Sequence, residues 1–155
     1  MENLISCGVI IHDHAFILGC HPTYLPENHF DIPKGRMEKG ESFFETAIRE
    51  TLEETGYKAD ELAPLHELGL FDYMPEKDLY LFDCYVGSLK AIMRNKWPEC
   101  TSSFFVDVNR KRIFENDAFR AIGLSEIDKY FSKRMAGVIH LALGLFEEGE
   151  EYLYD

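Results

Sequence analysis

One stretch, residues 35–57, constrains the fold of this 155-residue chain more than any other segment. It reads GRMEKGESFFETAIRETLEETGY, and no proline or glycine interrupts residues 43–55, which predicts a helix there. Ser42 is placed to cap the start of this helix, and Glu45 completes a capping box three residues later. Gly56 follows as the residue that ends it. The stretch therefore predicts a loop that leads into one short, capped helix.

This helix divides into two faces when its side chains are placed at about 100° per residue. Three glutamates on one face are spaced i, i+3 and i+4, so their carboxylates converge on one patch. Such like charges repel one another unless a cation neutralises them, and a hard divalent ion such as Mg²⁺ is the simplest choice. The alternative is a solvated acidic face of a surface helix. The acidic face carries Glu45, Arg49, Glu50, Glu53 and Glu54, and the face expected to be buried carries Phe44, Ala47, Ile48, Thr51, Leu52 and Thr55.

The spacing of these residues resembles the Nudix box, a pattern of glycine, glutamate and arginine at fixed separations. The matching positions are Gly35, Glu41, Arg49, Glu50, Glu53, Glu54 and Gly56. At about 7% for each residue type, seven fixed matches arise by chance roughly once in 10⁸ starting positions. Thr51 and Tyr57 replace aliphatic residues of the pattern, and both positions concern packing. The resemblance implies an α/β fold, the Nudix-type α/β/α sandwich with a mixed β-sheet between helices, as a single domain over residues 1–155 with an acidic tail at 147–155.

The resemblance also implies roles for individual residues. Divalent ions, Mg²⁺ with Mn²⁺ as a substitute, would bind the carbonyl of Gly35 and the carboxylates of Glu50, Glu53 and Glu54. Glu50 would also serve as the base, while Glu41 and Arg49 orient the helix carboxylates by contacts of the bidentate kind. Which carboxylate is the base and which is a ligand stays open at this point. Members of the family usually take one more acid from outside the box; the first candidate is Glu115 and the second is Glu99.

Three cations, Lys34, Arg36 and Lys39, flank the start of the box in a chain whose net charge is −12. We expect them to contact phosphate groups of a substrate, the alternative being ordinary balance of surface charge. The preceding FDIPKG segment resembles a lead-in that is common among dinucleoside polyphosphate hydrolases and also occurs in diphosphoinositol and RNA-decapping members.

Tyr73 lies sixteen residues past the box, where a tyrosine resembles the dinucleoside polyphosphate hydrolases and predicts stacking on a base. Pro75 lies close to the same offset, where a proline resembles ADP-ribose hydrolases, and a tyrosine in a hairpin can also be simply packed.

Composition restricts the class of protein further. The acidic balance argues against extended nucleic-acid binding, which needs a basic face, but leaves room for a small phosphate substrate. The four cysteines have no metal-finger spacing and are expected to be free thiols. The start of the chain lacks a basic and apolar leader, and the apolar run 138–146 is too short to span a membrane. We therefore expect a cytoplasmic protein without a membrane partner, and the resemblance adds that family members often form homodimers.

The rest of the chain predicts strands around the central helix and helices at the end. His12 and His14, in the first turn, are expected to face solvent, with metal ligation as the alternative. Ser125 is expected to cap a helix. The predicted strands are 4–11, 15–20, 30–33, 64–74, 78–88, 101–108 and 118–122, a polar loop is predicted at 90–99, and an amphipathic helix at 134–146.

The leading functional hypothesis is an enzyme that cleaves a nucleoside diphosphate linked to another group, with a dinucleoside polyphosphate such as diadenosine tetraphosphate as the favoured substrate. A pyrophosphatase that removes damaged nucleoside triphosphates and an RNA 5′-end pyrophosphohydrolase are the enzymatic alternatives. A nucleotide sensor without activity is the remaining class, and the complete set of box glutamates argues against it.

Overall fold

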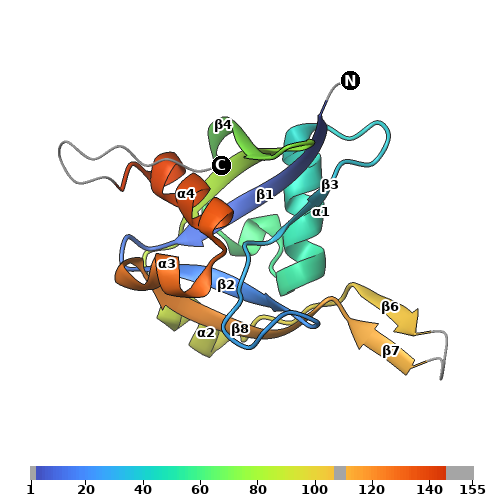
Figure 1. Ribbon diagram of the computed structural model, residues 1–155. Coiled ribbons are helices and arrows are strands. Elements are labelled where there is room, and N and C mark those ends of the chain that lie inside the picture. The colour runs from blue at the N-terminus through green and yellow to red at the C-terminus, as the bar shows by residue number, and fades with distance from the viewer. Residues whose placement is uncertain (1–2, 107–110, 146–155) are drawn as a thin grey trace.

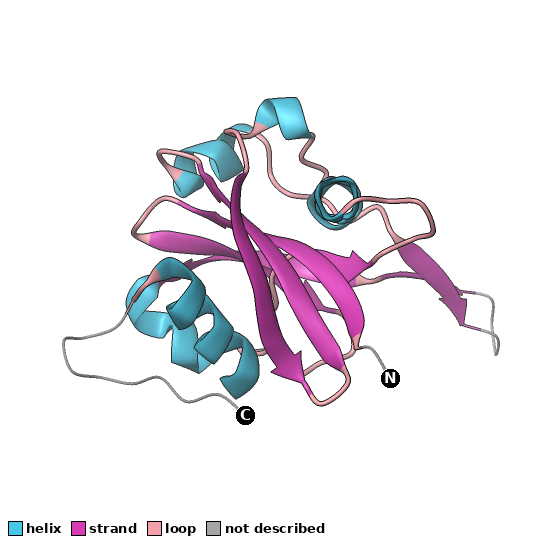
Figure 2. Ribbon diagram, turned by 90° about the horizontal axis from the view of Figure 1, so that it is seen from above, coloured by secondary structure: helices cyan, strands magenta, loops and turns pink. Residues whose placement is uncertain are grey.

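The computed structural model describes residues 3–106 and 111–145, and it forms one mixed sheet between two layers of helices (Figure 1). The strand order is β4-β5-β1-β2-β8, with β3 paired to β1, and β6 and β7 form a separate hairpin that projects from the body. Figure 2 shows helices on both sides of the twisted sheet, which confirms the predicted α/β/α sandwich. The strands are β1 (Leu4–His12), β2 (Phe16–Pro22), β3 (Lys34–Arg36), β4 (His66–Met74), β5 (Lys77–Tyr85), β6 (Ser103–Val106), β7 (Lys111–Phe114) and β8 (Asn116–Gly123), and the helices are α1 (Phe43–Thr55), α2 (Leu89–Asn95), α3 (Ile127–Tyr130) and α4 (Lys133–Leu143), with short 3₁₀ turns at Ala59–Glu61 and Leu124–Glu126.

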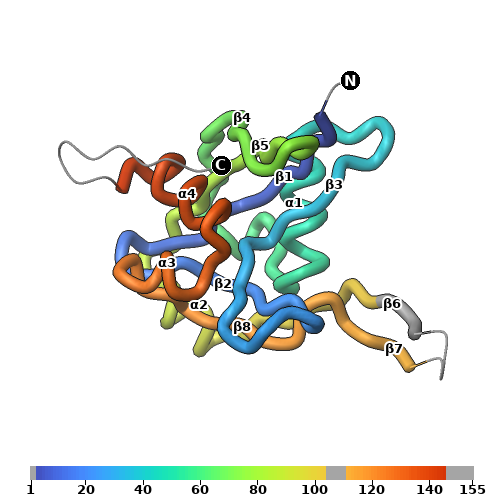
Figure 3. Tube along the Cα trace, in the orientation of Figure 1, coloured from blue at the N-terminus to red at the C-terminus, as the bar shows by residue number. Residues whose placement is uncertain are grey.

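β1 is the strand around which the sheet is built. It is buried from Ser6 to His12, pairs in parallel with β5 along its whole length, and pairs with β2 only at the turn, through His12 and Ile17. The segment that leads into the box fills the space between β1 and β2, as the trace in Figure 3 shows. Asp31 bridges to Cys20 of β2, and Lys34 pairs with Gly8 of β1. In the segment 30–33, where a strand was predicted, Phe30 and Asp31 form only isolated bridges. The regular strand β3 begins after that segment, at Lys34.

The sheet has a separate hydrophobic core on each side. On one side, Ile10, Leu79, Leu81 and Ile122 pack against α3 and α4. On the other side, Cys7, Val9, Ile11 and Leu18 pack against α1 and α2. This division follows from the two-residue period of the strands, because neighbouring side chains point to opposite faces. All four cysteines are free and buried, as predicted. No helix within the described residues is both long enough and apolar enough to cross a membrane.

Several predictions outside the box are wrong. The polar loop expected at 90–99 is in fact α2, which begins after Ser88, whose hydroxyl accepts a hydrogen bond from the amide of Ala91. Ser125 caps no helix: it lies in a 3₁₀ turn, and Glu126 precedes α3 without a side-chain cap. The final helix is capped by Ser132 instead, and the end of the predicted helix, Phe146, lies outside the described residues together with the tail at 147–155 and part of the strand expected at 101–108.

The first turn contains two histidines with different surroundings. His14 is exposed, as expected, but His12 is buried, and its Nε2 lies 2.8 Å from Oδ2 of Asp83. No group of three or more His, Cys, Asp or Glu side chains in residues 3–106 and 111–145 is arranged so that it could hold a metal ion. Metal ligation by these histidines stays an untested alternative.

Candidate active site

Helix α1 has the limits that its capping residues predict. The Ser42 hydroxyl accepts a hydrogen bond from the Glu45 amide at 3.1 Å, and the Glu45 carboxylate accepts one from the Ser42 amide at 3.0 Å. Gly56 ends the helix with a φ of 77°, in the left-handed region that favours glycine. Two residues of the expected buried face are exposed, however: Phe44 and Leu52 lie at 47% and 40% exposure. Compared with the expected orientation, α1 is rotated about its axis, so that the helix face carrying Glu54 is turned toward the sheet.

Arg49 organises the acidic face of α1. Its guanidinium makes a bidentate contact with Glu41, through Nε to Oε2 at 2.7 Å and Nη2 to Oε1 at 2.9 Å. The same side chain donates to Oε1 of Glu50 at 2.9 Å and to the Arg36 carbonyl at 3.0 Å. Because the Arg49 guanidinium donates to it, and amide and hydroxyl groups do so too, the Glu41 carboxyl has a pKa lowered to about 2. Arg49 therefore ties the loop before α1 to the carboxylate of Glu50.

Glu54 is the most buried carboxylate of this face, at 8% exposure. Its Oε2 accepts a hydrogen bond from the backbone amide of Lys34 at 2.9 Å, and its Oε1 accepts one from Nδ2 of Asn116 at 3.2 Å. Burial, and to a smaller extent the neighbouring Glu50, raise the pKa of Glu54 to about 9 against the lowering effect of the Asn116 hydrogen bond. Burial also raises the pKa of Glu50. The two carboxyl groups therefore cannot both ionise at low cost without a nearby cation.

Gly35 lies directly against this pair. A Cβ atom at Gly35 would overlap the carboxyl group of Glu50, so any side chain there would displace it. The direction of the Gly35 carbonyl toward a metal stays a prediction. The contact explains why the box requires glycine here: the backbone of β3 and a carboxylate of α1 share one small space.

Glu53 lies next to this pair, because Nη1 of Arg49 contacts Glu50 and Glu53 alike and the charge of Glu53 contributes to the raised pKa of Glu50. Its side chain is 39% exposed, and its oxygens lie 3.4 Å from Nη1 of Arg49. The donors nevertheless suit a hard divalent ion, because they are all carboxylate oxygens and because Glu50 and Glu54 share a site whose charge needs a cation. Glu53 can complete such a site by rotating away from Arg49.

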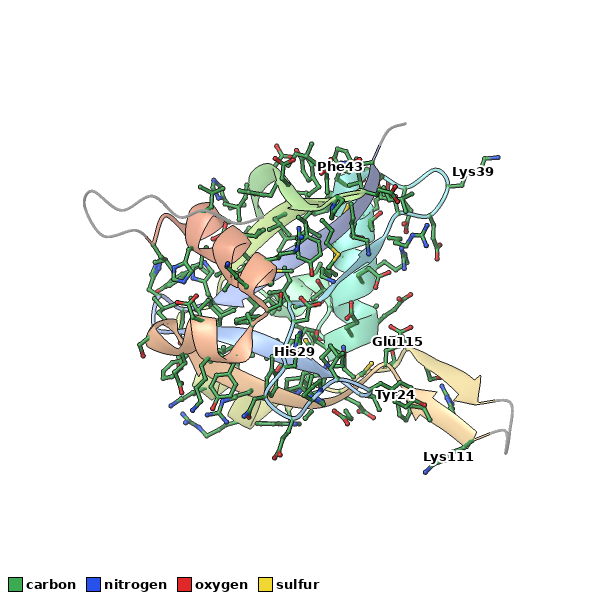
Figure 4. The ribbon with its side chains drawn as sticks, in the orientation of Figure 1. Tyr24, His29, Lys39, Phe43, Lys111 and Glu115 are labelled. Carbon is green, nitrogen blue, oxygen red and sulfur yellow. The ribbon has the colours of Figure 1, made fainter. Side chains whose placement is uncertain are left out.

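The acid expected from outside the box stays a prediction, and neither candidate contacts the box carboxylates directly in the described contacts. Glu115 is exposed, and its Oε2 accepts a hydrogen bond from the Ser102 hydroxyl at 3.1 Å; Figure 4 shows it at the root of the β6–β7 hairpin. Glu99, the second candidate, is exposed too, and its amide donates to the Thr55 carbonyl. The residue that does reach Glu54 is Asn116, the next one along the chain from Glu115. The sequence indicated the place of this contact, just before the strand predicted at 118–122. It did not indicate that the contacting residue would be an asparagine.

The predicted phosphate-binding cations separate into two sets. Nζ of Lys34 lies 2.9 Å from Oδ2 of Asp31; burial lowers the pKa of Lys34, but the contact with Asp31, together with the nearby Tyr73 and Glu54, raises it overall. Lys77 has its pKa lowered by burial and by the nearby charges of Lys34 and Arg36, so these three cations form one group. Lys77, at the start of β5, was missed because it is far from the box in sequence. Lys39 is exposed and points away from the body (Figure 4).

Tyr73 is 6% exposed and belongs to the core between the sheet and α4. Its ring centre lies 5.6 Å from Nζ of Lys34, and its carbonyl accepts a hydrogen bond from Arg134 at 3.0 Å. With Asp72 among its neighbours, Tyr73 lines an open hollow of about 440 Å³. Because most of the ring is covered, stacking on a base there requires the covering side chains to move.

The fold and the acidic site together define a class of enzyme that hydrolyses phosphoric anhydride bonds. The family model for the NUDIX domain matches residues 3–119, and the chain belongs to the Nudix family of hydrolases. The chain is 36% identical over 107 residues to an uncharacterized 17.7 kDa protein of Enterobacteria phage T4, covering 68% of this chain and 69% of that protein. It is 31% identical over 132 residues to the asymmetrical bis(5'-nucleosyl)-tetraphosphatase of Rattus norvegicus, covering 79% of this chain and 81% of that protein. The structure of a MutT NUDIX hydrolase from Burkholderia pseudomallei superposes with a TM-score of 0.64 at 16% identity, covering 95% of this chain and 100% of that one, and shows the same fold.

Proposed function

We propose that this chain is a Mg²⁺-dependent pyrophosphohydrolase that cleaves dinucleoside polyphosphates such as diadenosine tetraphosphate. The observation that carries the proposal is the carboxylate pair of Glu50 and Glu54, which lies against the backbone of Gly35 and Lys34. Arg49 contacts Glu50 but is shared with Glu41 and Glu53, so a divalent ion would still be needed to balance the charge of the cluster. The choice of substrate is supported by the similarity to a bis(5'-nucleosyl)-tetraphosphatase. It is supported also by the group of Lys34, Arg36 and Lys77 on an otherwise acidic chain.

The residues of the chain supply positioning and proton transfer. A bound divalent ion would neutralise phosphate charge and lower the pKa of water. Arg49 holds the Glu50 carboxylate at 2.9 Å, so that Glu50 is oriented to accept the proton of the attacking water. The Lys34 amide and Asn116 fix both oxygens of Glu54. The three grouped cations would bind the phosphates that do not contact the ion.

Location and assembly follow as further parts of the proposal. A cytoplasmic location agrees with four buried free thiols, which persist in a reducing compartment. A homodimer is retained as a prediction, to be tested by the mass of the protein in solution.

The test is release of nucleotide products from a panel of substrates, with Mg²⁺, with Mn²⁺ and with EDTA. The panel contains diadenosine tetraphosphate, ADP-ribose, 8-oxo-dGTP, GTP and a triphosphate-ended RNA. We expect metal-dependent formation of ATP and AMP from diadenosine tetraphosphate, and its loss in Glu50→Gln and Glu54→Gln proteins. Glu61→Gln is the matched control, because Glu61 pairs with Lys96 at the surface away from the acidic site.

Turnover of the triphosphates or the RNA alone would refute the dinucleotide as substrate. Equal activity in the Glu54→Gln and Glu61→Gln proteins would refute the site itself.

A further inference from the structure

An open hollow of about 430 Å³ lies at the root of the β6–β7 hairpin, on the far side of Asn116 from the box. We call it the Trp97 hollow. Its walls come from the segment that follows α2, from the end of β7 and from the start of β8; they include Trp97, Pro98, Glu99, Phe114, Asn116 and Asp117. Its volume falls within the range of about 300–1,000 Å³ that is usual for small-molecule sites.

Two exposed aromatic side chains line this hollow. Trp97 is 61% exposed and Phe114 is 42% exposed, although both are large apolar groups. The guanidinium of Arg112 lies 5.2 Å from the centre of the Phe114 ring, which is a cation–π contact. Exposed aromatic faces beside a hollow are the surfaces on which nucleobases stack, and base stacking tolerates any of the bases.

The charge of the hollow excludes the phosphate end of a nucleotide. Its described lining residues include two acids, Glu99 and Asp117, and no lysine or arginine. Asp117 is fixed in place because the His21 imidazole hydrogen-bonds to it, while the other nitrogen of His21 lies 3.0 Å from the Pro26 carbonyl. A fixed carboxylate accepts hydrogen bonds from an exocyclic amino group, which adenine, guanine and cytosine carry.

Asn116 connects this hollow to the acidic site. The side chain lines the hollow and also donates to Oε1 of Glu54 at 3.2 Å, so the two sites are one amide group apart. The neutral aromatic end of a ligand in the hollow and its phosphates at the box would therefore lie on either side of Asn116.

We propose that the Trp97 hollow binds a nucleobase of the substrate, stacked on Trp97 and Phe114, with an amino group of the base donating to Asp117. This inference rests on the proposed function, because it assigns a place to one base of the nucleotide that is cleaved. It gives the enzyme a preference for amino-bearing bases over uracil.

Trp97 is the single tryptophan of the chain, so its fluorescence reports on this hollow alone. The titration uses the Glu50→Gln protein with Mg²⁺, so that ligands are not consumed, and compares ATP, UTP and inorganic tripolyphosphate. Binding of each is measured independently by equilibrium dialysis. We expect ATP to change the Trp97 emission and tripolyphosphate to bind without changing it. Phe114→Leu should weaken ATP binding about tenfold, in line with the loss of one stacking contact, and leave tripolyphosphate binding unchanged.

Phe114→Tyr, which keeps an aromatic face, should restore ATP binding, and Phe44→Leu, an exposed aromatic on α1, is the matched control without effect. ATP that binds with no change in emission, or with the same affinity in the Phe114→Leu protein, would overturn the inference. A base-dependent signal in a protein that does not cleave diadenosine tetraphosphate would support the hollow and refute the substrate of the proposed function instead. Cleavage of diadenosine tetraphosphate with no base-dependent change in Trp97 emission would support the proposed function and refute the hollow as a site for the base.

Discussion

The raised pKa of Glu54 makes a quantitative prediction about folding stability in the absence of metal. In the folded protein burial raises this pKa to about 9 from an ordinary value of 4.5. Between these two values the folded state holds a proton that the unfolded chain releases, so stability falls as pH rises. Below pH 4.5 the contribution is complete, because both states are protonated. From pH 4.5 to 7 the loss spans two and a half pH units at about 1.4 kcal/mol each, or about 3 kcal/mol.

The perturbation is Glu54→Gln, which removes the titrating group and keeps the shape of the side chain. We expect the pH dependence of the unfolding free energy between pH 5 and 8 to be reduced by up to about 4 kcal/mol relative to the unmodified protein, both in EDTA. Under the proposed function a divalent ion binds the ionised pair, so Mg²⁺ should raise the stability of the unmodified protein at pH 8 and have little effect on the variant.

The assay is chemical denaturation at several pH values, followed by circular dichroism. Glu53→Gln is the matched control, because it changes the neighbouring box glutamate at a position that is 39% exposed and leaves Glu54 intact. Identical slopes against pH for the unmodified protein and the Glu54→Gln variant would refute the argument that Glu54 is buried with a raised pKa. A Glu53→Gln slope as flat as that of Glu54→Gln would assign the effect to the acidic face as a whole.

Three further predictions concern the neighbouring contacts. Gly35→Ala should displace the Glu50 carboxylate and cost about 1–3 kcal/mol in overpacking, with a lower kcat; unchanged kcat and denaturation midpoint would contradict the overlap. Arg49→Lys keeps the charge but not the bidentate contact, so kcat should fall about 10- to 100-fold in steady-state assays, and a change in KM alone would argue against a positioning role. Burial lowers the pKa of His21, but its contacts, chiefly with Asp117, raise this pKa overall. His21→Gln should therefore destabilise the protein more at pH 5.5 than at pH 8.5. Equal losses of unfolding free energy at the two pH values would refute the ion pair.

Local signals in the box were sufficient to predict α1. Its start and end are set by hydrogen bonds of Ser42 and Glu45 and by the left-handed conformation of Gly56, all within a few residues. The contact between Arg49 and Glu53 was predictable for the same reason, because the two residues are four positions apart and one turn of helix brings them together. Such contacts depend on sequence spacing alone.

Tertiary contacts decided the features that were predicted wrongly. The rotation of α1 buries Glu54 and exposes Phe44 and Leu52, which reverses the order that side-chain polarity favours. The burial of Glu54 is compensated by the Lys34 amide and by Asn116, donors that lie 20 and 62 residues away in sequence.

The helix α2 is a different case, because its capping residue and its helix-favouring residues are present in the local sequence. Ser88 is a good N-cap, and Leu89, Ala91 and Met93 favour helix, but lysine, arginine and tryptophan suggested a polar loop. Two polar faces and a single buried seam, formed by Leu89 and Met93, are sufficient for a short helix that packs on a sheet.

The parallel pairing of β1 with β5 has a consequence for biosynthesis. Leu4 pairs with Lys77, so β1, which leaves the ribosome before β5, has no complete partner until β5 has been made. At about 5–20 residues per second, translation of the intervening segment takes roughly 4–15 s. During that time a nearly continuous apolar strand, from Cys7 to Ile11, is exposed to solvent and to other nascent chains. Until β5 has been made, this apolar strand therefore needs protection from aggregation, for example by chaperones.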